Sequence, residues 1–504
     1  MKIRRITIVL LLLFLGILKS IAQDWEAKFP ALFKKTEGMG IYHTNQGKTI
    51  LLAHSDDWIH LKLLEDAMVE TAQLSLPFKN KKERIAFIGK SENEQTAYFQ
   101  YFVTEKEEYT LKVLAIDLSN TSQVQMEEKE IKAFGEMNLI TSFEHEGTLY
   151  LVEHLEGKSS LKIHEIKGEE YVKNTVFDLE NIDSKDLYER EKKTPWVLRS
   201  EFTSEELFEA KKWQQVKNEE FVYLPDIESS RKYYVQDGKL ILTYDNILET
   251  LMWKLDLKTG SIESYQFDSA DNSYPISNDM ETTSFLKGDK LFQFVVNKSF
   301  GLFTVYGLSE HKVLKTIELF PESDLSFVNK QPATIGFLNK YKERTNYPIK
   351  SAKGFLRSVN KKKASLSVNF SESGNYLVEL GGVTIPSYNY YFYDPFFFQQ
   401  QQFLNPTINI TPPSFPGGGP DGGEVYFETE ESITSKATLE IILDGESFET
   451  IKNYNREFRD VDYGKLLFDL TNKSKGSAYH KKGGMYYVLT HEKREWFINF
   501  IRPI

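Results

Sequence analysis

Short apolar runs and stretches in which every second residue is apolar recur along the chain, separated by turns of Gly, Asn, Asp or Lys. The turn at Gly238 is followed by an apolar run at Leu240–Tyr244, a second run at Leu251–Leu257 and an alternating segment at Ser261–Phe267. A period of two residues is typical of β-strands, and closely spaced strands joined by tight turns pair antiparallel. The pattern therefore predicts three consecutive antiparallel strands here.

The same strand-turn-strand unit recurs about seven times. The other copies begin at turn residues, at Gly47, Gln95, Gly147, Gly288, Gly374 and Gly484. Several neighbouring copies start about 50 residues apart, in the range of four-stranded propeller blades. A lone unit buries too little surface to be stable, and a closed ring removes exposed strand edges. We therefore predict an all-β fold, a β-propeller of about seven blades (six or eight are the neighbouring counts). Two β-sandwiches or an open array of sheets are the alternatives.

One copy carries a resemblance to known repeats. The run Trp253–Gly260, with the sequence WKLDLKTG, resembles the strand and turn of quinoprotein-type and related propeller repeats, although the other copies keep neither its Trp nor its Thr-Gly. The resemblance implies the architecture and no activity. The chain ends close behind an apolar strand, Glu495–Ile501. Because a ring needs its last blade tied to its first, we expect the segment after Gln23 to add a strand to the C-terminal blade.

The first 22 residues have the features of a signal peptide. Basic residues precede an apolar run at Ile6–Leu18, and small residues at Ser20 and Ala22 predict cleavage before Gln23. The apolar run is shorter than the roughly 20 residues that a membrane-spanning helix needs. A retained membrane anchor is the alternative. We therefore assign residues 1–22 to a signal peptide and residues 23–504 to the propeller domain.

The absence of cysteine excludes a disulfide framework and a lipid-modified cysteine. The signal ending in Ala22-Gln23 and the abundance of Lys, Asn, Tyr and Phe resemble exported proteins of the Bacteroidota. Asp268-Ser269-Ala270 also matches the short acceptor motif of O-glycosylation in these bacteria. The signal peptide predicts a protein of the periplasm, the cell envelope or the extracellular space, and the missing cysteine predicts that it is not a lipoprotein.

The charge balance makes nucleic acid an unlikely partner class. The net charge is −11, and removal of residues 1–22, which carry four basic residues and no acidic one, makes it −15. Phosphate-backbone binding depends on clustered Lys and Arg. The nearest basic cluster, Lys361–Lys363, lies between two alternating runs and is predicted to be a hairpin turn.

Two insertions interrupt the repeats. The first, near residues 180–222, is charged and helix-prone. Thr203-Ser204-Glu205-Glu206 reads as a capping box, which predicts a short helix through Trp213. Leu207, Ala210 and Trp213 would share one face of that helix. This face either packs on the propeller or binds a partner.

The second insertion, residues 386–423, combines aromatic residues with Gln, Pro and Gly. Its prolines and glycines oppose regular strands, so we predict a long loop. The aromatic rings could pack over a blade, contact a protein or a saccharide, or insert at a membrane interface. The predicted interaction residues are Tyr388, Tyr390, Tyr391, Phe392, Tyr393, Phe396, Phe397 and Phe398, together with Trp213.

The sequence contains no HExxH pair, nucleophile elbow or phosphate loop. We therefore assign no catalytic or metal-binding residue and expect no cofactor. His54–Asp57 lies in a predicted turn that should face solvent, and His145 and His154 flank Gly147 so that they could approach each other across a hairpin. Propeller enzymes gather catalytic residues from separate blades, so missing motifs do not decide the matter.

We predict a non-catalytic, exported envelope β-propeller that binds a protein or carbohydrate partner through its two insertions. One alternative is a propeller hydrolase or lyase that acts on glycans or peptides at the mouth of the channel. A second alternative is a structural protein attached peripherally to the outer membrane through residues 388–398.

Overall fold

The computed structural model describes residues 25–29, 38–44, 48–55, 58–64, 70–77, 84–93, 95–105, 108–119, 125–135, 137–156, 158–179, 213–216, 222, 224, 230–247, 249–269, 274, 277, 279–338, 342–371, 373–384, 435–452, 477–482, 485–492 and 495–501. Within these ranges the strands form seven sheets of four or five strands each. This repeated small antiparallel sheet makes the fold a β-propeller, as the sequence predicts. The chain divides into two compact units, Met1–Lys81, Ser119–Val124 and Phe458–Ile504 in one, and Lys82–Leu118 and Gln125–Glu457 in the other.

The first unit contains two sheets. One is a meander of β2 (Gly38–His43), β3 (Thr49–Ser55), β4 (Trp58–Leu64) and β5 (Glu70–Pro77). The other has the order β1-β30-β29-β28, where β1 is Trp25–Phe29, β28 is Ser477–Lys482, β29 is Met485–Glu492 and β30 is Glu495–Ile501. β1 pairs antiparallel with β30 along its whole length. The predicted strand contribution from the N-terminal segment to the C-terminal blade is confirmed.

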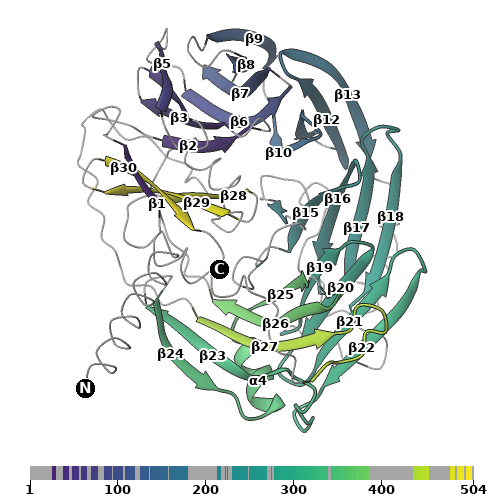
Figure 1. Ribbon diagram of the computed structural model, residues 1–504. Coiled ribbons are helices and arrows are strands. Elements are labelled where there is room, and N and C mark those ends of the chain that lie inside the picture. The colour runs from purple at the N-terminus through teal and green to yellow at the C-terminus, as the bar shows by residue number, and fades with distance from the viewer. Residues whose placement is uncertain are drawn as a thin grey trace, which may run out of the picture. The chain divides into compact units, whose positions relative to one another are not determined.

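The second unit contains five sheets that follow one another in chain order (Figure 1). Three of them are four-stranded meanders, built from β6 (Arg84–Glu92), β7 (Thr96–Glu105), β8 (Glu108–Asp117) and β9 (Met126–Gly135); from β10 (Leu139–His145), β11 (Thr148–His154), β12 (Ser160–Lys167) and β13 (Glu170–Asp178); and from β19 (Glu281–Lys287), β20 (Lys290–Val296), β21 (Gly301–Gly307) and β22 (Lys312–Leu319). Between the last two lies a meander of β15 (Arg231–Gln236), β16 (Lys239–Asp245), β17 (Glu249–Asp256) and β18 (Ile262–Asp268), extended by the short parallel strand β14 (Gln214–Gln215).

The fifth sheet departs from a simple meander. Its order is β24-β23-β27-β26-β25, where β23 is Lys330–Leu338, β24 is Lys342–Pro348, β25 is Lys363–Phe370, β26 is Tyr376–Thr384 and β27 is Ser435–Leu443. The first three strands of the meander are β25, β26 and β27. The place of the fourth strand is taken by β23, which precedes all three in the chain and pairs antiparallel with β27. The sheet is therefore completed by an earlier part of the sequence.

The glycine turns of the repeats lie where the sequence predicts them. Gly147 joins β10 to β11 with φ +74°, Gly238 joins β15 to β16 with φ +70°, and Gly288 joins β19 to β20 with φ +60°. These are left-handed conformations that cost glycine little and most other residues more. The run of three strands predicted after Gly238 is observed as β16, β17 and β18.

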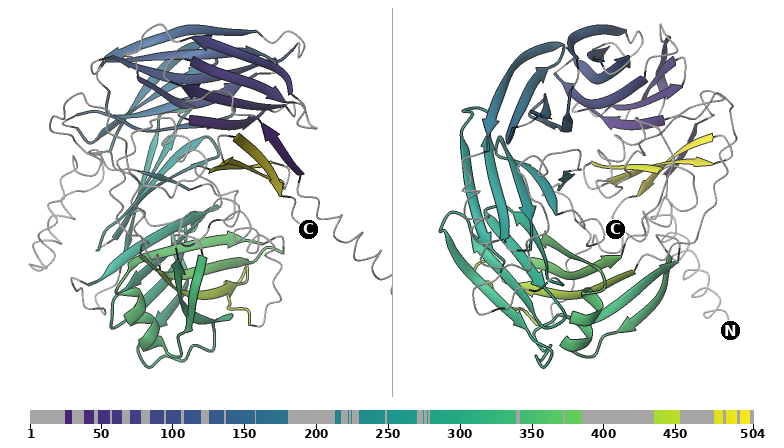
Figure 2. Two further views of the ribbon diagram at one scale, coloured as in Figure 1. Left: turned by 90° about the vertical axis from the view of Figure 1, so that its left-hand side faces the viewer. Right: turned by 180° about the vertical axis from the view of Figure 1, so that it is seen from behind.

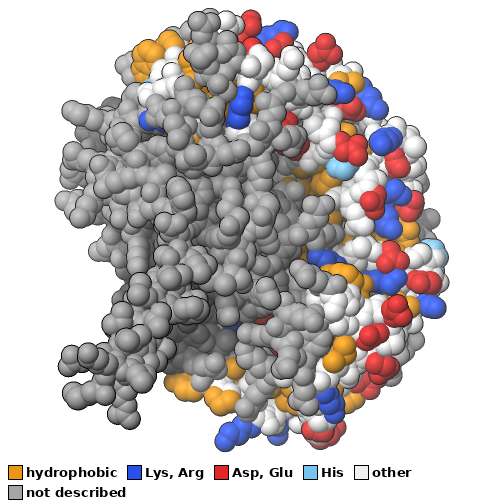
Figure 3. All heavy atoms as spheres, viewed as in Figure 1, with side chains coloured by type: hydrophobic (Ala, Val, Ile, Leu, Met, Phe, Trp, Pro, Cys, Tyr) orange, Lys and Arg blue, Asp and Glu red, His pale blue; other side chains and the backbone are white. Residues whose placement is uncertain are grey.

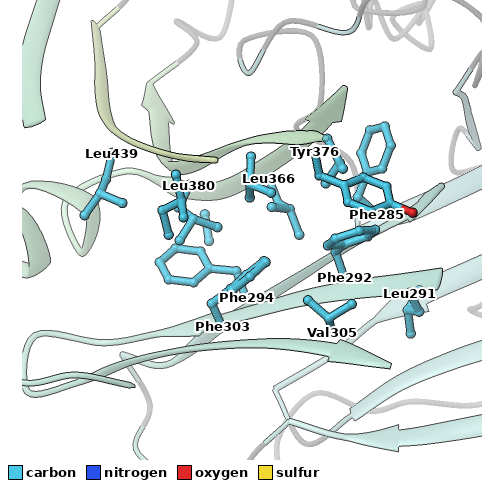
Figure 4. Close-up of a cluster of buried hydrophobic side chains, with 14 of the residues drawn as sticks. Phe285, Leu291, Phe292, Phe294, Phe303, Val305, Leu366, Tyr376, Leu380 and Leu439 are labelled. Carbon is cyan, nitrogen blue, oxygen red and sulfur yellow. The ribbon is translucent and has the colours of Figure 1, made fainter. Parts of the chain in front are cut away.

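Hydrophobic residues from successive sheets of the second unit share common cores. Ile88, Phe102 and Leu111 of the β6–β9 sheet pack with Leu149 and Leu151 of the next. A second cluster joins the β10–β13 sheet to the β14–β18 sheet, and the largest joins the β14–β18, β19–β22 and β23–β27 sheets. Figure 4 shows part of this largest cluster, in which Phe292, Phe294 and Phe303 face Leu366 and Leu380. Face-to-face burial of neighbouring sheets is the packing that stabilises propeller blades.

A helix that the sequence analysis did not predict packs beside the fifth sheet (Figure 2). α4 (Ala352–Val359) buries its apolar face, including Phe355 and Leu356, in the largest cluster. Ser351 caps it by accepting a hydrogen bond from the Gly354 amide. Lys361–Lys363 thus joins a helix to β25, and the prediction of a hairpin turn between two strands was wrong. The apolar residues of the short run before the lysines fit both the helical period and the strand period. Packing against the sheet favours the helix.

Several predictions fall outside the described residues. They are the signal peptide at 1–22, the aromatic loop at 386–423 and most of the helical insertion near 180–222. Within the described part of the chain, no helix has the length and apolar character required to cross a bilayer.

Candidate functional site

The aromatic insertion leaves the fifth sheet between two strands that remain paired up to its base. β26 and β27 pair continuously from Tyr376 opposite Leu443 to Thr384 opposite Ser435. Thr384 and Ser435 therefore face each other where residues 385–434 depart and return. In an ordinary hairpin this position would hold a short turn. The insertion thus replaces a turn and leaves the pairing of the sheet intact.

Lys362 joins the two ends of the insertion. Its Nζ donates a hydrogen bond to Thr384 Oγ1 at 3.2 Å and another to Ser435 Oγ. Burial lowers the pKa of Lys362, and the charge of the adjacent Lys361 lowers it further. The ammonium group is therefore held at the base of the insertion by two hydroxyl groups, at the end of the loop that links α4 to β25.

An exposed aromatic residue lies on the edge of the same sheet. Tyr347 on the edge strand β24 is 64% exposed. It pairs with Thr334, which pairs in turn with Ala437, two residues beyond Ser435. The edge strand thus presents a tyrosine ring close in register to the base of the insertion. Figure 3 shows that the described surface elsewhere carries interspersed acidic and basic side chains.

Of the predicted interaction residues, the structure describes only Trp213. Tyr388, Tyr390, Tyr391, Phe392, Tyr393, Phe396, Phe397 and Phe398 lie outside the described residues. Trp213 is described, is not helical and comes directly before β14. Its side chain is only 4% exposed and belongs to the cluster that includes Tyr233 and Trp253. This burial agrees with the packing interpretation of Trp213.

The histidines singled out in the sequence do not form a pair. His145 ends β10 opposite Thr148, whereas His154 ends β11 at the other end of the hairpin. The expected approach of these two side chains was therefore wrong, because the strands between them are seven residues long. His154 is buried, with Nε2 2.8 Å from the carbonyl oxygen of Lys158. His54 lies in β3, while Asp56 and Asp57 lie outside the described residues.

The proposed glycosylation acceptor is closed off from solvent. Ser269 is fully buried, and its Oγ accepts a hydrogen bond from Thr282 Oγ1 at 3.0 Å. A glycan on this hydroxyl would require the β18 end and the start of β19 to separate. In the folded protein Ser269 is therefore a packing residue that joins two sheets.

A buried ion pair within the β14–β18 sheet is bonded to the β19–β22 sheet through Ser284. Lys232 Nζ lies 2.7 Å from Asp245 Oδ2, and both side chains are fully buried. Asp245 also accepts hydrogen bonds from Thr250 Oγ1 at 2.8 Å and from the Ser284 amide at 2.9 Å. These donors satisfy the carboxylate in a low-dielectric interior. Both side chains are shielded from solvent, and the Ser284 amide connects Asp245 to the neighbouring blade.

A second cluster combines a carboxylate, an imidazole and a phenol. His164 is fully buried, with Nε2 2.7 Å from Glu153 Oε2 and Nδ1 2.8 Å from Tyr171 Oη. Asn174 Nδ2 donates to the same phenolic oxygen at 3.0 Å. No sequence motif points to His164. The sequence shows only a histidine in a run that alternates with apolar residues. Its role becomes apparent only when Glu153 and Tyr171 are seen on the two adjacent strands.

No metal site is visible in the described ranges, where no group of three or more His, Asp or Glu side chains is suitably placed.

The chain matches no protein-family model and no curated protein sequence. Among solved structures it is similar to the Dos1 propeller, with 9% identity over 94% of each chain and a TM-score of 0.33. It is similar to the polysaccharide lyase Uly1, with 10% identity over 94% of this chain and 91% of the lyase and a TM-score of 0.32. It is also similar to the virginiamycin B lyase of Staphylococcus aureus, with 12% identity over 71% of this chain and 96% of that chain and a TM-score of 0.26. Likeness at this level says nothing about a substrate or partner of this chain.

Proposed function

We propose that this chain is an exported β-propeller of the cell envelope that binds a protein or carbohydrate partner through the insertion between β26 and β27. The observation that supports the proposal is the continuous pairing of these strands from Tyr376–Leu443 to Thr384–Ser435. A sheet that is complete without its insertion leaves the inserted residues available for another role. Long insertions between paired strands are commonly functional.

The chemistry of the insertion fits a contact surface. Tyr and Phe offer large, rigid contact area, and Tyr adds a hydroxyl group that can bond a peptide or a sugar. Residues 388–398 concentrate these side chains in one short segment. Lys362, by bridging Thr384 and Ser435, holds the start and end of the insertion together. Holding the two ends of a contact segment together lowers the entropy cost of ordering it on binding.

The proposed location follows from the N-terminal segment. Cleavage before Gln23 would release an acidic, cysteine-free protein into the periplasm or beyond it. The enzymatic alternative, a hydrolase or lyase, would use side chains from several strands instead of the insertion.

Binding can be tested with two variants of the mature protein. In one, residues 385–434 are replaced by Asn-Gly, which suits a two-residue hairpin turn between Thr384 and Ser435. In the other, the eight tyrosines and phenylalanines at positions 388–398 named above are changed to Ser, so that the length of the insertion is kept. Cross-linked capture from native envelopes and binding to a glycan array are measured for both and for the unaltered protein.

We expect a partner, either protein or glycan, that binds the unaltered protein and is lost from both variants. Phe370→Ser, which alters an exposed aromatic residue opposite Tyr376 at the end of the sheet away from Thr384 and Ser435, serves as the matched control and should retain binding. Equal binding by all four proteins would contradict the proposal, and so would the absence of any partner for the unaltered protein.

A further inference from the structure

The cluster of Glu153, His164 and Tyr171 has the connectivity of a base-assisted nucleophile. A nucleophile of this kind needs a base within hydrogen-bonding distance of its proton and a third group that orients the base. Tyr171 Oη and Glu153 Oε2 lie on opposite nitrogens of the His164 ring, at 2.8 Å and 2.7 Å. The three side chains come from the adjacent strands β11, β12 and β13 of one sheet.

The hydrogen bonds fix the direction of the relay. Burial raises the pKa of Glu153, but the hydrogen bond from His164 and the charge of Lys162 outweigh it, so the pKa lies below its ordinary value. Glu153 is therefore ionised at neutral pH and can only accept, so His164 Nε2 donates to it. In the neutral imidazole Nδ1 is then the acceptor. In this uncharged form of the ring, which a base requires, the Tyr171 hydroxyl donates to Nδ1 and accepts from Asn174.

Burial and charge around the cluster suit this role. His164 is fully buried, and the Phe134 ring lies nearly perpendicular to it, with ring centroids 5.0 Å apart. Tyr171 is half-buried, and Asn174, which bonds its hydroxyl group, is exposed. Lys132 Nζ lies 3.6 Å from the centroid of the Tyr171 ring. An ammonium group over the ring stabilises negative charge that develops on the phenolic oxygen.

We propose that Tyr171 is a nucleophile that takes an acyl group from an ester or similar acyl donor, with His164 as its base and Glu153 as a positioning residue. As the phenolic oxygen forms a bond to the acyl carbon, its proton passes to His164 Nδ1. The bond from the acyl carbon to the leaving group breaks, and the leaving group departs with that electron pair. The proton is then passed to the leaving group or to water, so no oxidant, reductant or metal is needed.

The test uses N-acetylimidazole as the acyl donor and the intact mature protein. Peptide mass spectrometry follows acetylation of Tyr171 and of Tyr347, which is 64% exposed and serves as the internal reference. Hydroxylamine reverses tyrosine O-acetylation but not lysine N-acetylation, which identifies the modified atom. We expect Tyr171 to be acetylated faster than Tyr347 although it is the less exposed of the two.

Three variants separate an acid-base role from a packing role. Glu153→Gln and His164→Gln should each lower the ratio of Tyr171 to Tyr347 acetylation by about 10-fold or more, because general-base assistance is removed. Glu165→Gln is the matched control, since Glu165 lies next to His164 on β12 and pairs with Lys173. It should leave the ratio unchanged.

The proposal is overturned if Tyr171 reacts no faster than Tyr347, or if Glu153→Gln changes the ratio no more than Glu165→Gln does. A purely structural cluster would lower the thermal stability of Glu153→Gln without changing that ratio. If His164→Gln fails to fold, the comparison of the two glutamate variants still decides the question.

Discussion

Trp25 and Phe500 are register partners in one sheet, although they come from opposite ends of the chain. The backbone pairing continues to Phe29 opposite Trp496, so β30 has a neighbour on each side, β1 and β29. Without β1, the backbone groups of one edge of β30 would lose their partners, which is costly and favours aggregation.

We expect a mature protein that begins at residue 30 to unfold at a lower urea concentration than one that begins at Gln23, and to aggregate more readily. Urea titration followed by circular dichroism measures the first effect, and light scattering measures the second. Deleting 494–504, which removes β30 itself, should have a larger effect than deleting β1. If the protein lacking 494–504 unfolded like the full mature chain, the pairing of β30 with β1 and β29 would not contribute to the stability of the fold.

The buried pair of Lys232 and Asp245 should be costly to break. Lys232→Met leaves the Asp245 carboxylate buried without its cation, and we expect the free energy of unfolding to fall by about 3–5 kcal/mol. Lys239→Met is the matched control, because Lys239 pairs with Glu263 at 3.2 Å where both side chains are partly exposed. That change should cost less than about 1 kcal/mol. Similar losses in the two variants, measured by chemical denaturation, would show that the burial of the first pair has no energetic consequence.

His60 should make stability depend on pH. Burial lowers its pKa from 6.5 to about 4, and its side chain is 1% exposed. Between these two values the unfolded chain binds a proton that the folded chain does not, so the free energy of unfolding falls as the pH drops from 6.5 to 4 and levels off below that. The contribution is at most about 3 kcal/mol.

The variant His60→Phe keeps a flat ring and removes the titrating group. Ser75, whose Oγ lies 2.9 Å from His60 Nδ1, is exposed and can bond water instead. We expect the free energy of unfolding of the variant to rise relative to that of the unaltered protein as the pH is lowered from 6.5 to 4. A difference that stays constant across this range would show that His60 is protonated equally in the two states.

The N-cap of α4 offers a smaller, local prediction. Ser351→Ala removes the hydroxyl group that accepts from the Gly354 amide and should lower the free energy of unfolding by about 1 kcal/mol. Ser351→Asp keeps an acceptor at the same position and should be nearly neutral. Thermal unfolding of the three proteins under identical conditions provides the comparison, and equal losses for Ala and Asp would rule out the capping role.

Replacing residues 385–434 by Asn-Gly should leave the fold at least as stable as before. Thr384 and Ser435 are already opposite each other, and shortening the connection between two paired strands lowers its closure cost by about 0.6 kcal/mol for each halving of length. A Gly-Ser segment of the original length is the control for the loss of specific residues. A loss of stability in both variants would mean that the natural insertion packs against the rest of the protein.

Local signals explain what the sequence predicted correctly. Gly147, Gly238 and Gly288 indicate turns that depend on the left-handed backbone of one or two neighbouring residues, and the alternating runs beside them indicate strands. Partners distant in sequence give no such signal. The pairing of β23 with β27 and the meeting of Glu153, His164 and Tyr171 depend on register between strands, which one sequence does not reveal. Trp213 shows a related limit, since a helical period predicted a helix through it, whereas the chain there is not helical and the side chain packs in a core shared by two sheets.

The order of strands in the fifth sheet has a consequence for synthesis of the protein. β23 and β24 leave the ribosome first and can pair as a hairpin. The other edge of β23 pairs with β27, which is made only after α4, β25, β26 and residues 385–434. A pairing between such distant segments forms late, and until then the edge of β23 is free to pair with another strand. The length of the insertion therefore sets how long this part of the nascent chain needs protection, even though it costs the finished sheet little.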